Sequence, residues 1–145
     1  MMQSIPAWFY WAFLSALFAS LTAIFAKMGL EGVDSDFATL IRTVIILFAI
    51  IAFVYYTGKW ADPSILGAKT WTFLTLSGLA TGASWLCYFR ALKIGDAAKV
   101  APIDKLSVVL VALFAVLFLG ERPAAKDWLG IIFIGTGVIL LALKR

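Results

Sequence analysis

Five long apolar runs constrain this chain more than any other feature of its sequence. About twenty apolar residues are enough for a helix to cross the hydrocarbon core of a bilayer. The sequence is 63% hydrophobic and only 14% charged, and a soluble fold of 145 residues could not hide so much apolar surface. We therefore expect an all-α integral membrane protein that sits in a lipid bilayer with five transmembrane helices, at Trp8–Met28, Phe37–Tyr56, Trp71–Leu92, Val100–Leu119 and Trp128–Leu143.

The breaks between these runs are short, so the sequence predicts one transmembrane domain over residues 1–145 with no soluble domain. Met1–Ala7 carries no basic residue, which favours a retained first helix over the alternative of a cleaved signal peptide. Cys87 is the only cysteine and histidine is absent, which excludes a disulfide framework, a Cys/His metal site and a Ser-His-Asp triad within one chain.

Other function classes are also disfavoured. The basic residues are scattered rather than gathered into a tract that could follow a phosphate backbone, so we expect no nucleic-acid partner. No GxxxxGK[ST] loop is present, so ATP does not drive this chain directly. A membrane enzyme would need carboxylate pairs, histidine or a metal cluster, and we expect neither an enzyme nor a cofactor.

The basic residues of the loops are almost evenly divided between the two membrane sides. The side of the N-terminus, called side A, holds Lys59, Lys69, Arg122 and Lys126, and side B holds Arg90, Lys93, Lys99, Lys144 and Arg145. An excess of Lys and Arg normally marks the cytoplasmic side. The near balance permits insertion in both orientations, and the alternative is that one loop dominates and a single topology results.

Several charged residues lie inside the predicted spans, in the half nearer side B. They are Lys27, Arg42, Arg90, Asp104 and Lys105. A charge near the bilayer centre costs about 3 kcal/mol on insertion scales. Long basic side chains can instead reach the headgroups from a helix end, but the short side chain of an aspartate cannot. Asp104, the only acid inside a predicted span, is therefore expected to pair with Lys27, Arg42 or Lys105.

Pro102 lies two residues before this acid. Inside a helix, a proline removes one backbone hydrogen bond, which membrane proteins tolerate where irregular backbone lines a cavity. Alternatively, Pro102 occupies the first turn of its helix, where it is harmless.

Polar side chains recur at helical spacing along the third run, with Trp85 among them. They are Ser77, Thr81, Ser84 and Tyr88. Such a stripe could face a polar interior, or its hydroxyls could bond to their own helix backbone. The last run contains three glycines, Gly130, Gly135 and Gly137. Such small residues permit close helix packing, either within the chain or at a dimer interface.

In combination, these features resemble a known family. "TAIFAKMGLEGVDSDFATLIRTVI" resembles the first hairpin of EamA-type domains in the drug/metabolite transporter superfamily. "YFRAL" at Tyr88–Leu92, "LGE" at Leu119–Glu121 and the Gly-rich last helix resemble later elements of the same domain. The resemblance covers nearly the whole chain. It implies a half-length bacterial or archaeal member with one repeat, where most members carry two.

The resemblance implies a secondary transporter in the cell membrane for a small metabolite or drug-like solute. Because the two halves of such transporters have inverted topology, a single repeat implies an antiparallel homodimer or a related five-helix partner. The alternative is a non-transporting helper or scaffold subunit. Small multidrug-resistance proteins, by comparison, have an acid in the first helix that this chain lacks, so any proton coupling would use Asp104. The candidate residues for the solute path and its gates are Lys27, Arg42, Ser77, Thr81, Ser84, Trp85, Tyr88, Pro102, Asp104 and Lys105.

Overall fold

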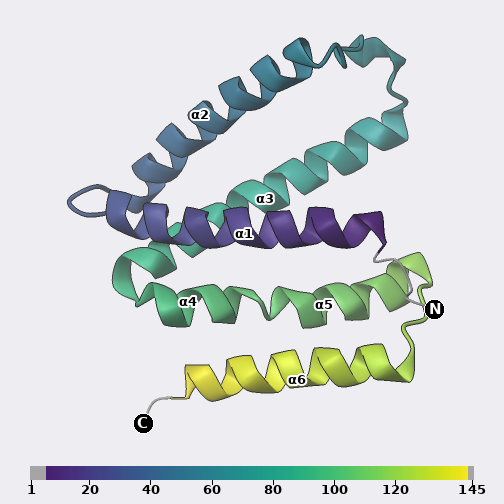
Figure 1. The fold of residues 1–145 in the computed structure, drawn as a ribbon. Helices are drawn as coiled ribbons and strands as arrows, with labels where there is room; N and C mark the ends of the chain where they lie inside the picture. Colours follow the sequence, from purple (N-terminus) through teal and green to yellow (C-terminus); the bar gives the residue numbers. More distant parts are fainter. Residues whose placement is uncertain (1–5, 144–145) are drawn as a thin grey trace. The chain divides into compact units, whose positions relative to one another are not determined.

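A computed structural model describes residues 6–143, which form helices and connections without a strand (Figure 1). Lys144 and Arg145, which we counted as bases of side B, lie outside the described residues. In chain order the elements are α1 (Ala7–Gly29), α2 (Ser35–Tyr56), the 3-10 helix η1 (Pro63–Ile65), α3 (Ala68–Ile94), α4 (Ala97–Asp104), α5 (Ser107–Phe114), the π-helical turn η2 (Ala115–Leu119) and α6 (Ala125–Ala142).

The all-α membrane class is confirmed. Within residues 6–143, four helical stretches are long and apolar enough to cross a membrane: Ala7–Gly29, Ser35–Tyr56, Ala97–Leu119 and Ala125–Ala142. The helix α3 is longer than any of them, at 27 residues, but is not among the four. Its hydroxyl-bearing residues and glycines lower its hydropathy, and its role as a fifth span stays a prediction.

The described chain divides into two compact units. One consists of the described parts of Met1–Ile24 and Ile94–Arg145, which we call unit 1, and the other consists of Phe25–Lys93, which we call unit 2. The boundary after Ile24 falls within α1, so the last turns of that helix belong to unit 2.

In unit 1, α6 packs against both α4 and α5. The preceding segment ends at Gly120, whose φ of 67° is a left-handed conformation that glycine adopts without a steric penalty. Asp127 lies in the first turn of α6 and stabilises the start of this helix, because its carboxylate accepts a hydrogen bond from the backbone N–H of Ala124 at 2.8 Å. Gly135 is buried, and a Cβ atom at this position would lie 3.2 Å from Cγ2 of Val109, so the glycine permits close packing of α6 on α5.

In unit 2, aspartates cap the starts of α2 and of the 3-10 helix η1. Asp34 caps α2, since its Oδ1 accepts hydrogen bonds from the amides of Asp36 at 2.9 Å and Phe37 at 3.0 Å. This cap explains why α2 begins at Ser35, two residues before the predicted start. In the connection to α3, the backbone N–H of Ser64 donates to Asp62 and holds the pKa of that carboxyl below its usual range.

One end of unit 2 is tied together by polar contacts. The guanidinium of Arg90 grips the carboxylate of Asp36 with two bonds, Nε to Oδ1 at 2.9 Å and Nη2 to Oδ2 at 2.6 Å. Lys93 donates to the carbonyl of Val33, and Lys27 donates to the carbonyl of Leu92 at 2.7 Å. These contacts join the end of α3 to the end of α1 and to the turn between α1 and α2. We call this part of the structure the tied end of unit 2. Away from it, nearly every residue between positions 44 and 80 is exposed.

The two-bond geometry predicts that Asp36 and Arg90 stabilise each other more than a simple surface pair. We expect a double-mutant cycle with Asp36→Asn and Arg90→Gln to give a favourable coupling energy that exceeds the coupling energy of a single-contact surface pair. The measurement is the free energy of unfolding in mixed detergent micelles. The control is the single-contact pair of Asp96 and Lys99, 3.7 Å apart at the start of α4, for which we expect a smaller coupling energy. Equal coupling in the two cycles would contradict a special role for the pair.

The close contact at Gly135 predicts that α6 tolerates no large side chain there. Gly135→Leu should destabilise the protein by about 1–3 kcal/mol, because the new side chain must displace Val109. The same change at Gly137, where nothing lies within 4 Å of an added Cβ, is the matched control and should cost less. Thermal unfolding in detergent measures both, and Val109→Ala should partly rescue Gly135→Leu. A larger loss from Gly137→Leu would show that the packing is assigned to the wrong glycine.

Candidate functional site

Arg42 lies against two aromatic rings of α3. Its guanidinium carbon is 4.3 Å from the centroid of the Trp85 ring and 5.0 Å from that of Phe89. Such cation–π contacts contribute about 0.5–2 kcal/mol each, more as the site is desolvated. Arg42, which we expected in a gate, and Trp85, which we expected in the path lining, are therefore neighbours in unit 2.

The aromatic contacts leave the hydrogen-bonding capacity of Arg42 unmet. Its Nη1 is buried and has no hydrogen-bond partner in the described part of the chain. A buried donor without an acceptor costs about 1–3 kcal/mol, and more when it is charged. Asp36, six residues earlier on the same helix, forms its ion pair with Arg90 and not with Arg42. No acid of residues 6–143 forms an ion pair with Arg42.

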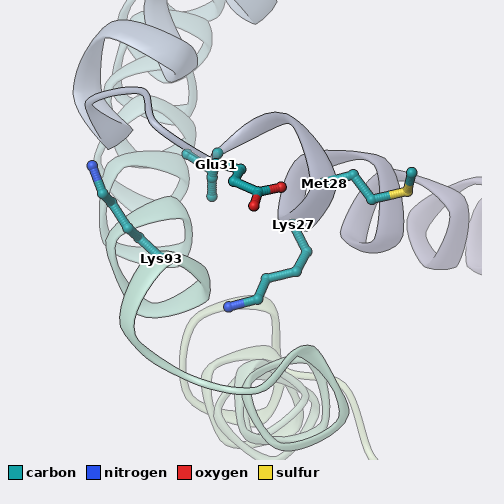
Figure 2. A pocket seen from close by; sticks show the side chains of 5 residues that line it. Lys27, Met28, Glu31 and Lys93 are labelled. Atoms are coloured by element: carbon teal, nitrogen blue, oxygen red, sulfur yellow. The ribbon is translucent and has the colours of Figure 1, made fainter.

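A pocket of about 400 Å³ opens at the tied end of unit 2 and is lined by Lys27, Met28, Leu30, Glu31 and Lys93. Figure 2 shows that Lys27 and Glu31 extend into the same space from the end of α1 and the turn that follows it. Lys93 lies along the opposite wall, with its ammonium turned away from Lys27 (Figure 2). Both lysines donate to backbone carbonyls, so they also hold helix ends in place.

The polar stripe of α3 is present on the surface of the isolated chain. Ser77, Thr81 and Ser84 are exposed, and Trp85 and Tyr88 are half-buried. The hydroxyl of Thr81 donates to the carbonyl of Ser77 at 2.8 Å, so the alternative of bonding to the helix's own backbone holds for this residue. This bond leaves the hydroxyl oxygen able to accept from a second group.

The predicted fourth span is interrupted. Because α4 begins at Ala97, Pro102 lies in its interior, and the alternative of a first-turn proline is wrong. The helix stops at Asp104, and α5 begins at Ser107. Around this break the backbone amides of Lys105, Leu106, Val108 and Val109 bond to the carbonyl three residues earlier instead of four, at 2.9–3.0 Å.

Asp104 sits at this interruption and pairs with its neighbour. Its Oδ2 is 3.1 Å from Nζ of Lys105, and both side chains keep substantial exposure, 36% and 55%. One of the three expected pairings of Asp104 is therefore present. Lys27 and Arg42 belong to unit 2, so a cluster of all four residues stays a prediction.

The sequence reasoning missed two acids and one aromatic residue. Asp36 and Asp127 lie in the first turns of α2 and α6, so the expectation that Asp104 is the only acid inside a span is wrong. The predicted span begins at Phe37 and leaves Asp36 in the loop, although Asp34 before it signals an earlier helix start. Phe89 was missed because it precedes Arg90 in an apolar run, but it lies four residues after Trp85 and shares its helix face.

Several known proteins similar to this chain are transporters by name. The profile described as the EamA-like transporter family matches residues 6–143. An "Uncharacterized transporter in cobO 3'region" from Sinorhizobium sp is 63% identical over 136 residues, covering 94% of this chain and 96% of that protein. The "Uncharacterized transporter YxxF" of Bacillus subtilis is 27% identical over 136 residues, which are 93% of this chain but 42% of YxxF.

A third relative carries a more specific name. The "Probable 4-amino-4-deoxy-L-arabinose-phosphoundecaprenol flippase subunit ArnE" of Yersinia pestis (strain Pestoides F) is 30% identical over 84 residues, covering 57% of this chain and 74% of ArnE. No solved structure matches the chain. Since the family profile spans almost the whole sequence and the apolar helices are in place, this multi-pass membrane protein belongs to the EamA-like transporter family.

Proposed function

We propose that this chain is a secondary transmembrane transporter of a small metabolite or drug-like solute and works by alternating access. The interruption of the fourth span beside Asp104 is the observation that carries this proposal. Irregular backbone at membrane depth is tolerated where protein buries it or where it lines a water-filled cavity. Discontinuous helices form substrate and ion sites in many secondary transporters.

In this proposal, residues 1–145 form one five-helix domain in the cell membrane, and a second copy in the opposite orientation completes the transporter. Two observations support an inverted dimer. The chain corresponds to 42% of the longer relative YxxF, as expected if one chain supplies half of a transporter. The loop bases of the two sides are also nearly balanced. A related five-helix protein could take the place of the second copy.

The proposed path runs along the polar face of α3, where Ser77, Thr81, Ser84, Trp85 and Tyr88 meet the solute. Lys27, Arg42, Asp104 and Lys105 act as gates, and Asp104 exchanges ion-pair partners as the gates open and close. Pro102 lets the fourth span bend at its interruption. The exposure of the serine and threonine side chains supports this path, because hydrocarbon would otherwise contact them.

A non-transporting subunit is the second candidate, and the name of ArnE as a flippase subunit favours it. In that function, the same polar surfaces would bind a different membrane protein instead of lining a path. Transport by this chain alone separates the two candidates.

The proposed inverted dimer predicts that the chain inserts in both orientations. We expect C-terminal fusions to alkaline phosphatase, active only outside the cytoplasm, and to green fluorescent protein, fluorescent only inside, to give signal in separate cells. Adding two lysines to the loop between α2 and α3 should bias the population to one orientation. Signal from one reporter alone would contradict the inverted homodimer.

The gating role predicts that Asp104→Asn lowers solute uptake by proteoliposomes that contain only this chain. A useful panel is amino acids, dicarboxylates, sugar phosphates and a lipophilic cation. Loss of an ion pair coupled to gating by about 1.4 kcal/mol changes the population of an open state tenfold, so uptake should fall by about that factor. Asp96→Asn, which removes an exposed acid outside the interruption, is the matched control. Unchanged uptake in Asp104→Asn refutes the gate, and no uptake of any solute by the unmodified chain favours the subunit function.

A further inference from the structure

Arg42 presents a guanidinium whose faces and edge are in different environments. The Trp85 and Phe89 rings lie within 4.3 and 5.0 Å of the guanidinium carbon and fix the side chain against α3. Hydrogen bonds of a guanidinium leave from its edge, in the plane of its five N–H groups. Nη1 on this edge has no acceptor among residues 6–143, while Arg42 as a whole is only half-buried. The site thus holds an oriented cation with donors left over.

The other basic side chains of unit 2 near this region are already engaged. Arg90 is bound to Asp36 through two bonds, and Lys27 and Lys93 donate to the carbonyls of Leu92 and Val33. Arg42 differs from all three because its guanidinium lies on the Trp85 and Phe89 rings and forms no ion pair within residues 6–143. A group that supplies oxygen acceptors in the plane of this guanidinium would complete the site.

We propose that Arg42 binds the carboxylate or phosphate group of the transported solute, and that the solute is therefore an oxyanion or a zwitterion carrying one. This inference rests on the transporter function proposed above. The planar fork of arginine matches carboxylate and phosphate oxygens with two parallel hydrogen bonds, which a lysine ammonium cannot do. Trp85 and Phe89 position the fork, and the exposed hydroxyls of α3 lie on the same helix as these rings. A cationic solute would be repelled at this point.

The test is binding of three four-carbon probes to the purified full-length chain in lipid nanodiscs. The probes are butyrate, butyl phosphate and the neutral butyramide, and the readout is the saturable rise in Tm that a ligand of the folded state causes. Butyrate and butyl phosphate should raise Tm, and butyramide should not. Arg42→Gln should abolish the rise, and Arg42→Lys should weaken binding about tenfold or more because the fork is lost. Arg122→Gln, at an exposed loop arginine, is the control and should bind as the unmodified chain does.

Three results would overturn the inference: a rise of equal size with butyramide, no saturable rise with either anion, or full binding by Arg42→Gln. If Arg42→Gln does not fold, Arg42→Lys decides, since it keeps the charge and loses the fork. Proteoliposomes separate this inference from the proposed function. Anion binding without uptake would retain the site and reject the transporter, whereas uptake of neutral solutes that Arg42→Gln leaves unchanged would retain the transporter and reject the site.

Discussion

The cost of unpaired charge in hydrocarbon governs where this protein places its ionisable side chains. Arg90 lies with Asp36, and Asp104 lies with Lys105, so each of these two carboxylates has a cation within 3.1 Å. The lysines at the ends of α1 and α3 donate to backbone carbonyls. Arg42 differs: its guanidinium lies on the rings of Trp85 and Phe89 instead of beside a carboxylate, and its Nη1 has no hydrogen-bond partner among the described residues.

The same constraint applies to the backbone. A spanning helix satisfies its amides and carbonyls internally, and an interruption survives only where another group compensates it. Here the interruption follows Pro102 and coincides with the Asp104–Lys105 pair, and the amides after it shift to bonds over three residues. The proline, the ion pair and the three-residue hydrogen bonds therefore occur at the same place in the chain. A membrane helix can be irregular at such a place because its backbone amides still have acceptors.

Much of this arrangement follows from the sequence, and the failures have identifiable causes. Hydropathy locates the four apolar helices of residues 6–143, since a long apolar run is stable in lipid as a helix that satisfies its own backbone hydrogen bonds. The helix starts are less accurate, because the cap at Asp34 starts α2 two residues before the apolar run and thereby places Asp36 in the helix. Pairings across helices depend on rotation and depth, so neither the Asp36–Arg90 pair nor the contact of Arg42 with Trp85 could be derived from spacing along one helix.

The interior position of Pro102 was one of two readings that local sequence allowed. What decides between them is the start of α4 at Ala97, which depends on where the preceding helix ends. The grouping of Lys27 and Arg42 with Asp104 is a harder problem of the same kind. It requires the arrangement of two units, and no periodicity within either unit carries that information.

The tied end of unit 2 also has a mechanical consequence. The helix α2 runs from Asp36 to Tyr56 beyond the bonds to Arg90, a length of about 30 Å at 1.5 Å per residue. With its base held, this helix is a lever arm: a pivot of about 10° displaces its tip by about 5 Å. A small rearrangement of this single guanidinium–carboxylate contact would therefore be magnified at the far end of α2.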